Sequence, residues 1–376
     1  MHASWRVHCD LALKDATRRP GAPASLARRL LSFLSETVQL LHVRETGGPM
    51  IVARALKMLA GRHAAEGDLA EIDAFELFSA VLDGGVAELE LGAALAALAM
   101  KQLAPTEIAG FRRALQGRLN RLSAPSGARA VVIPSYGGAR VQANLMPLLA
   151  LMVARFGIPV LVHGPLEAHG RIASAAVFRE LGILPCASLR KAQAALETSR
   201  LAFVPTALLS PALAQLLALR ARLGGPNCAH HIARLADPFG GEGLKLVPAA
   251  DDAESDAFAA ALAMHHEHAL LFHGTEGEAY ADPLRRPAIV YFRSGEPTLL
   301  FDAEAASAPT HSGHVPERAE AKGTAQWISL ALAGKVPTPP PISNLLACCL
   351  YGTGLAQDFH QSKALVAVRS HSQAAA

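Results

Sequence analysis

The stretch from Ala130 to Gly164 constrains the fold more than any other part of the chain. An apolar run at 130–133 leads into the turn-rich sequence Pro134-Ser135-Tyr136-Gly137-Gly138, a helix-period segment follows, and a second apolar run ends in His163-Gly164. The order strand, glycine loop, helix and strand is typical of a parallel β-α-β unit. A glycine loop that leads into a helix offers backbone N–H groups and a positive dipole end to anions such as phosphate. The stretch therefore predicts an α/β fold and a partner that carries phosphate.

Apolar runs and helix-period segments continue to alternate through the rest of the chain. Strands are predicted at Val131–Ile133, Val160–Val162, Leu201–Val204, Ala269–Phe272 and Ala288–Phe292. Helices are predicted at Ala143–Phe156, Ile172–Leu181, Pro211–Leu223, Cys228–Leu235, Asp256–His265, Thr324–Ala333 and Ile342–Leu355. Because strands that alternate with helices form layered folds, residues 125–376 are predicted to be an α/β domain with a mostly parallel sheet flanked by helices.

Residues 50–124 have a helical pattern throughout and are predicted to form a small helical domain that mediates dimerisation. The four expected helices are Ile51–Ala60, Ile72–Leu82, Glu88–Leu103 and Glu107–Leu122. The second of them should end at Asp83-Gly84-Gly85, which is a glycine C-cap signal.

Residues 1–49 stand apart from this organisation. They contain the linker-like sequence Arg18-Arg19-Pro20-Gly21-Ala22-Pro23 and end in Thr46-Gly47-Gly48-Pro49, directly before Met50. Two explanations compete: the segment is a real extension, or it is read from an upstream start codon and translation begins at Met50. We favour the second, and mass spectrometry of the native N-terminus distinguishes them.

Composition narrows the class of protein. The 376 residues are 51% hydrophobic and 18% charged, which predicts a large buried core and excludes disorder over the whole length. No apolar run reaches the roughly 18 residues of a membrane-spanning helix, and no secretory signal is recognisable, so no membrane partner is expected. The five cysteines include no C-x-x-C pair, and the adjacent Cys348 and Cys349 lie in an apolar run. A reducing cytoplasm is therefore the expected location.

Positive charge is concentrated around the glycine loop. Residues 126–250 contain 12 Lys and Arg against 5 Asp and Glu, whereas residues 251–376 contain 8 against 14. Arginine outnumbers lysine 27 to 8, and a guanidinium suits bidentate contacts to phosphate. A GC-rich genome would equally explain the preference for arginine, but it does not explain the uneven distribution along the chain.

Several segments resemble a known family. They are the loop with the residues after it at 134–150, Val162-His163-Gly164, Pro238-Phe239, the run from His273 to Pro283, Leu89-Glu90-Leu91-Gly92 and Ala347-Cys348-Cys349-Leu350. Over about residues 50–370 the chain resembles glycosyltransferase family 3, the fold of anthranilate phosphoribosyltransferase. It more closely resembles a branch of that family, the YbiB-type DNA-binding proteins.

The chain departs from the pattern of the enzymes at three places. Where they have Gly-Thr-Gly-Gly-Asp to hold phosphoribosyl pyrophosphate, this chain has Ser135-Tyr136-Gly137-Gly138-Ala139, and their Lys-His-Gly-Asn-Arg element becomes Val162-His163-Gly164-Pro165-Leu166. Their magnesium-binding Asp-Glu pair falls at Ala279-Tyr280. Magnesium needs carboxylate oxygens, so these losses predict that the scaffold remains while the catalytic residues are gone.

The resemblance implies nonspecific binding of DNA or RNA by a homodimer, through a basic cleft between the two domains and without a cofactor. Phosphate contacts supply most of the affinity in such binding, and no base-reading element is needed. The alternative is a phosphoribosyltransferase-like enzyme that uses phosphoribosyl pyrophosphate and Mg²⁺, with Glu276 and Glu278 as metal ligands. A third possibility is a sensor of small anions or nucleotides.

The expected phosphate contacts are basic residues near the glycine loop and along the helical domain. Arg140 and Arg171 are each expected at the start of a helix, where a cation is unfavourable unless an anion binds beside it. Other candidates are Gly137, Gly138, Arg54, Lys57, Arg62, Lys101, Arg220, Arg222 and Arg234. For the basic ones the competing interpretation is a solvated face, an internal ion pair or, for Lys101, a helix C-terminal charge.

Four further features have two interpretations each. Tyr136 either stacks on a base or fills the space of the lost sugar site. His163 ends a strand and is expected to make a structural hydrogen bond. Glu276 and Glu278 are expected to order their loop rather than to bind magnesium. The histidine pairs at 230–231 and 265–266 lack a convergent partner at metal-ligand spacing, so no metal site is predicted.

Overall fold

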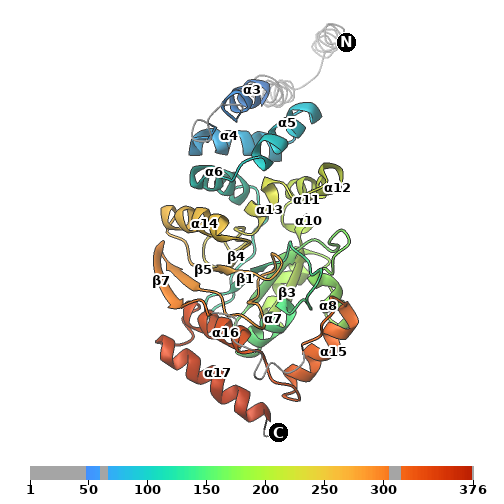
Figure 1. Ribbon diagram of the computed structural model, residues 1–376, viewed down its shortest axis with the longest axis vertical. Coiled ribbons are helices and arrows are strands. Elements are labelled where there is room, and N and C mark those ends of the chain that lie inside the picture. Colours follow the sequence, from blue (N-terminus) through green and yellow to red (C-terminus); the bar gives the residue numbers. More distant parts are fainter. Residues whose placement is uncertain (1–47, 60–66, 305–314, 375–376) are drawn as a thin grey trace, which may run out of the picture. The chain divides into compact units, whose positions relative to one another are not determined.

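The computed structural model describes residues 48–59, 67–304 and 315–374 (Figure 1). The chain divides into two compact units, Met1–Ile51 and Val52–Ala376, and the second contains both the helical region and the sheet. The predictions for the extension at 1–49 fall almost entirely outside the described residues, as does the predicted contact Arg62.

The four predicted N-terminal helices are present. They are α3 (Gly48–Leu59), α4 (Glu71–Leu82), α5 (Glu88–Ala99) and α6 (Pro105–Gln116). Helix α4 ends where predicted, and Gly84 after it has a left-handed φ of 70°. Helices α4 and α6 pack against each other, with the rings of Phe78 and Phe111 stacked at 4.9 Å between centroids. Helix α5 ends at Ala99 rather than at the predicted Leu103, and α6 begins at Pro105 and ends at Gln116 rather than at the predicted Leu122.

A seven-stranded sheet follows, and it is mostly parallel as predicted. Its strands are β1 (Val131–Pro134), β2 (Val160–Gly164), β3 (Leu201–Pro205), β4 (Leu244–Ala249), β5 (Ala269–His273), β6 (Ile289–Arg293) and β7 (Glu296–Phe301). The spatial order is β3-β2-β1-β4-β5-β6-β7, and β6 runs antiparallel to both of its neighbours, β5 and β7. Strand order reverses at β1, between β2 and β4, and such a reversal marks where α/β sheets bind ligands.

Two strands were not predicted, and one of them is central. Strand β4 pairs with both β1 and β5, but its sequence contains Lys245 and Pro248, which hide the apolar pattern of a buried strand. The Lys245 side chain is buried and forms an ion pair with Glu267, which also pairs with Arg112 of α6. This network joins the helical region to the sheet and explains how a lysine occupies a core strand.

Helices cover both faces of the sheet (Figure 1). They are α7 (Met146–Arg155), α8 (Ser174–Glu180), α9 (Leu189–Thr198), α10 (Thr206–Leu209), α11 (Pro211–Ala218), α12 (Arg220–Leu223), α13 (Cys228–Ala233), α14 (Asp252–Met264), α15 (Ala321–Leu332), α16 (Pro340–Gly352) and α17 (Phe359–Ala374). Side chains of β1 alternate between the two hydrophobic cores: Val131 and Ile133 lie in one, and Val132 lies in the other.

Two further predictions concern the apolar segments of the chain. Cys348 and Cys349 are buried in α16, as expected of core residues. Among the described residues, no helix combines the length and the apolar character that crossing a membrane requires.

A candidate anion-binding site at the glycine loop

The glycine loop follows β1 at the edge of the sheet where the parallel strands end, but it does not lead directly into a helix. Helix α7 begins at Met146, six residues after Arg140, so the prediction that Arg140 lies at a helix N-terminus is wrong. Arg171 likewise precedes α8, which begins at Ser174. The residues next to both arginines pair with each other instead, since Ala139 and Ile172 exchange backbone hydrogen bonds in an isolated antiparallel bridge. Gly138 has a φ of 67°, and a Cβ there would lie 2.7 Å from the Ala168 Cβ, so only glycine fits.

The backbone N–H groups after the loop donate to a carboxylate of the same chain. Glu276 accepts hydrogen bonds from three consecutive N–H groups, those of Arg140 at 2.6 Å and of Val141 and Gln142 at 2.9 Å. Burial favours a raised pKa for this carboxyl, but the three donors outweigh burial and lower its pKa. The Glu276 carboxylate therefore binds the loop N–H groups that the sequence predicted would bind a phosphate.

A second carboxylate occupies the other end of the loop. Glu278 is buried, with one oxygen accepting from the Gly138 N–H at 2.6 Å and the other from the Ser174 hydroxyl at 3.0 Å. The Ser174 hydroxyl is also within hydrogen-bond distance of Ser135 and Asn144. Burial raises the pKa of Glu278 despite these donors. The prediction that both acids order their loop is confirmed by these contacts.

The same contacts make the two carboxylates poor magnesium ligands. Mg²⁺ binds carboxylate oxygens with free lone pairs. Here Glu276 Oε1 accepts two hydrogen bonds, and Glu276 Oε2 and both Glu278 oxygens accept one each, so the loop already uses part of the lone pairs that a cation would need. Within the described ranges, no group of three or more His, Cys, Asp or Glu side chains is arranged to hold a metal ion.

Tyr136 fills the space beside the loop. Its hydroxyl lies 2.8 Å from His163 Nδ1, and both side chains are buried. Burial lowers the pKa of His163 to about 3 and raises that of Tyr136, so both groups are neutral at physiological pH. The expected structural hydrogen bond of His163 is confirmed, and its partner is the tyrosine of the loop.

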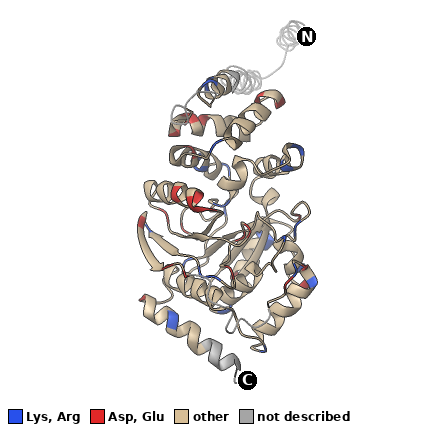
Figure 2. Cartoon of the chain, in the orientation of Figure 1, with Lys and Arg blue, Asp and Glu red and all other residues tan. Residues whose placement is uncertain are grey.

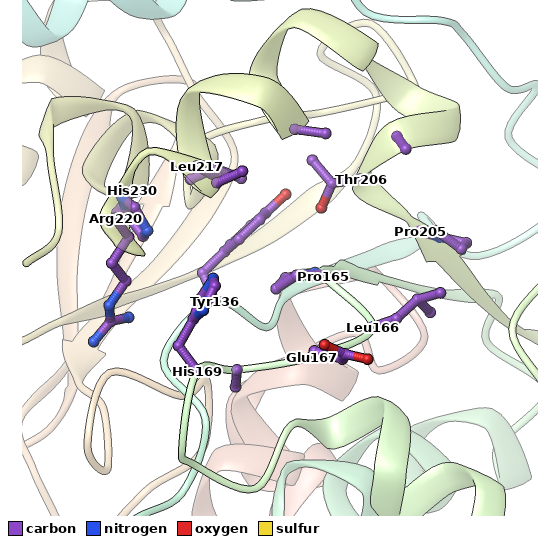
Figure 3. A pocket seen from close by; sticks show the side chains of 14 residues that line it. Tyr136, Pro165, Leu166, Glu167, His169, Pro205, Thr206, Leu217, Arg220 and His230 are labelled. Carbon is purple, nitrogen blue, oxygen red and sulfur yellow. The ribbon is translucent and has the colours of Figure 1, made fainter. Parts of the chain in front are cut away.

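A cavity of about 250 Å³ lies against Tyr136 (Figure 3). Its walls are mainly apolar and include Pro165, Pro205 and Leu217, and the Tyr136 hydroxyl points towards Thr206. Among the side chains that line the cavity, Arg220 and His230 lie at one side and Glu167 lies at another (Figure 3). Sequence reasoning missed Thr206 and Leu217 as site residues. Thr206 directly follows β3, whose last residue Pro205 pairs with Gly164 at the end of β2, and this position at the ends of parallel strands is the signal that could have found it.

Three of the predicted arginines near the loop and the cavity form no side-chain ion pair in the described part of the chain, although the charge of Arg171 helps to lower the pKa of Glu276. Arg140 is exposed. Arg171 is half-buried, and its Nη1 donates to the carbonyl oxygens of Gly137, Gly138 and Glu276, each at 3.3 Å. Partial burial lowers the pKa of Arg220, and the neighbouring charge of Arg171 lowers it further. Arg171 and Arg220 are therefore close enough to repel each other.

Most of the other predicted basic residues have acidic partners. Arg54 pairs with Asp73 at 2.6 Å, and Lys101 pairs with Glu107 at 2.8 Å and with Asp68. Arg222 lies 3.4 Å from Glu88, with both side chains exposed. Lys57 is exposed on α3. The charges of Arg54, Lys101 and Arg222 are therefore matched by nearby acids, and no contact between any of these four residues and the loop is seen in the described part of the chain.

Arg234 is part of a buried ion pair. It is 9% exposed and donates to Glu254 at 2.8 Å and to the Pro248 carbonyl at 2.7 Å. Glu254 belongs to a group of acids that begins α14 (Figure 2). It also pairs with His231, and this pairing accounts for one of the histidines considered as metal ligands.

Comparison with known proteins agrees with the fold. A model of the helical bundle domain of a glycosyl transferase family matches residues 55–118. Anthranilate phosphoribosyltransferase (TrpD) of Thermus thermophilus superposes with a TM-score of 0.66 at 23% identity, covering 85% of this chain and 94% of the enzyme. The Saccharomyces cerevisiae enzyme in complex with PRPP and Mg superposes with a TM-score of 0.65 at 14% identity, covering 86% of this chain and 94% of that enzyme. The fold is therefore that of the anthranilate phosphoribosyltransferase-like proteins of glycosyltransferase family 3.

Two relatives place the chain within this class. Anthranilate phosphoribosyltransferase of Methylocella silvestris is 30% identical over 186 residues, which cover 50% of this chain and 53% of that enzyme. The protein YbiB of Escherichia coli (strain K12) is 38% identical over 289 residues, which cover 76% of this chain and 89% of YbiB. The chain belongs to the YbiB family.

Proposed function

We propose that this protein binds DNA or RNA nonspecifically through the sugar-phosphate backbone and has lost phosphoribosyl transfer. The observation that carries the proposal is the arrangement at the glycine loop. Its N–H donors are occupied by Glu276 and Glu278, while Arg140, Arg171 and Arg220 around it form no side-chain ion pair among the described residues, although Glu276 lies within electrostatic reach of Arg171. A binder of polymer phosphates needs cations at the surface and does not need a cradle for pyrophosphate.

The mutual repulsion of Arg171 and Arg220 supports an anionic partner. Burial and the charge of Arg171 lower the pKa of Arg220, so two guanidinium groups close together are unfavourable in the free protein, and a phosphate between or beside them removes that cost. Strand phosphates offer several such charges in a row, so contacts that are individually weak act together.

A homodimer formed through the helical region belongs to the same proposal. Helices α4 and α5 expose the large apolar side chains Ile72 and Leu89, and Met100 directly after α5 is 87% exposed. Large apolar side chains at the surface are candidates for an interface. A dimer would present two loops to one strand, and we place the protein in the cytoplasm, where such strands occur.

The enzymatic alternative is less well supported. It needs Glu276 and Glu278 to hold Mg²⁺, and their oxygens accept hydrogen bonds from the loop instead. It also needs room for a sugar beside the loop, where Tyr136 is packed and bonded to His163. Release of pyrophosphate from phosphoribosyl pyrophosphate in the presence of an aromatic amine would support the enzyme and contradict the proposal.

The direct test is fluorescence anisotropy with a labelled oligothymidine strand, comparing Arg220→Ala with Arg222→Ala. Both residues belong to α12, both substitutions remove one positive charge, and Arg222 already faces Glu88. We expect Arg220→Ala to weaken binding to all sequences about equally and Arg222→Ala to change it little. Equal effects of the two substitutions would show that net charge matters and the site does not.

A further inference from the structure

The cavity beside the glycine loop has mainly apolar walls and one cation at its side, a combination that contacts to a sugar-phosphate backbone alone do not require. It is walled by the ring of Tyr136 and by apolar side chains such as Leu217 and Pro165, yet Arg220 forms part of the same wall (Figure 3). Its volume of about 250 Å³ is just below the roughly 300 Å³ at which pockets for drug-sized ligands begin. A ligand that matches it is small, flat and apolar, and carries negative charge next to its apolar part.

Thr206 provides a second, independent indication of a ligand. This side chain lines the cavity and is only 3% exposed, and its Oγ1 has no hydrogen bond of full geometry within the described residues. The Tyr136 hydroxyl faces Thr206, and hydrogen bonding from Thr206 opposes the raised pKa of Tyr136, but the same hydroxyl lies 2.8 Å from His163 Nδ1. A buried hydroxyl that shares its neighbour with another group keeps hydrogen-bonding capacity unused, and a ligand with a polar edge in the cavity would use it.

We infer that the cavity takes one unpaired base of a bound single strand, with Thr206 at the base edge and Arg220 at the adjacent phosphate. This inference rests on the proposed function and extends it to a preference for single strands over duplexes. A paired and stacked base cannot enter, whereas an unpaired base can leave the strand at small cost. A hydroxyl both donates and accepts, so Thr206 suits any base and leaves binding insensitive to sequence.

The position of Arg171 connects the cavity to the strand path. Arg171 holds the loop through the Gly137 and Gly138 carbonyls, directly after Tyr136, and its charge lies near that of Arg220. A base inserted beside Tyr136 therefore places its own phosphate among these two guanidinium groups. Base contact and backbone contact are then parts of one site.

The test compares an oligothymidine strand with an abasic strand of the same length and charge. Two variants of equal added bulk separate the cavity from the surface: Ala214→Leu fills the cavity from α11, and Ala221→Leu adds the same side chain on the exposed side of α12. We expect the wild-type protein to bind the abasic strand at least about fivefold more weakly, the lower limit for losing one stacked base. Ala214→Leu should remove that difference, and Ala221→Leu should keep it.

Thr206→Val provides a readout that does not depend on filling the cavity. It preserves shape and removes the hydroxyl, and it should reduce the difference between the two strands without changing the affinity for the abasic one. Equal wild-type affinity for both strands, or a difference that persists in Ala214→Leu, would overturn base insertion while leaving backbone binding intact. Failure of the wild-type protein to bind either strand would instead overturn the proposed function.

Discussion

Glu276 and Arg140 contact each other through the backbone rather than through their opposite charges. The Arg140 N–H donates to Glu276 Oε2 at 2.6 Å, and the guanidinium group remains at the surface. The carboxylate thus satisfies the donors that a glycine loop offers to a phosphate, and the arginine charge stays available to a partner. The backbone N–H groups of the loop are thus used within the protein, whereas the arginine side chains are the groups that we propose bind nucleic acid.

Glu276→Gln tests the internal anion. Because the folded-state pKa of Glu276 is lowered, its contribution to stability is present above the ordinary glutamate value of 4.5 and is lost as the pH falls through the lowered pKa. The wild-type melting temperature should therefore fall more steeply over this acid range than that of Glu276→Gln. At neutral pH the variant should be less stable than the wild type.

Glu278→Gln is the matched comparison, since burial raises the pKa of Glu278. Its contribution is most favourable at low pH, while the carboxyl is protonated, and is lost as the pH rises through the raised pKa. The two variants should therefore change the pH profile in opposite directions. Parallel profiles for both would contradict the assigned hydrogen bonds.

Tyr136→Phe tests the hydrogen bond between Tyr136 and His163 beside the loop. The substitution keeps the ring and removes the hydroxyl, which leaves His163 Nδ1 buried without its partner. An unsatisfied buried group of this kind costs about 1–3 kcal/mol, measured as the change in unfolding free energy in denaturant. Unchanged stability would show that the hydrogen bond contributes nothing.

Gly110→Ala tests the packing of the helical region. Gly110 lies in α6, where an added Cβ would meet the Glu71 carbonyl and lie 2.8 Å from the Ala74 Cβ on α4. Overpacking of this kind costs about 1–3 kcal/mol. Gly92→Ala in α5 is the control, because nothing lies within 4 Å of its added Cβ. It should stabilise the protein by roughly 0.5–1 kcal/mol, and a similar loss in both variants would contradict the described packing.

The sequence predicted the elements whose patterns are uninterrupted. Strands β1, β2 and β3 are continuous apolar runs, and their predicted bounds differ from the observed ones by one or two residues. Strand β4 was missed because the charge of Lys245 is neutralised by Glu267, a partner more than twenty residues away. Patterns along the chain do not report such contacts.

The candidate site was predicted only in part, again because contacts between distant parts of the chain decide the rest. The loop and the arginines around it follow from local sequence, but the N–H groups of residues 140–142 are bound by a carboxylate more than 130 positions later. Likewise, nothing local distinguishes Arg220 from Arg234, which is neutralised by Glu254 inside the fold. Which cations are available is decided by tertiary structure.

The dependence of strand affinity on salt tests the central claim most directly. Each phosphate neutralised on a single strand contributes about −0.7 to the slope of log affinity against log salt concentration. Replacing Arg140, Arg171 and Arg220 together by alanine should make the slope shallower by about 2. Replacing the paired Arg54, Arg222 and Arg234 together should leave the slope nearly unchanged, provided that circular dichroism shows the variant to be folded. Equal slopes for the wild-type protein and the first variant would contradict the account.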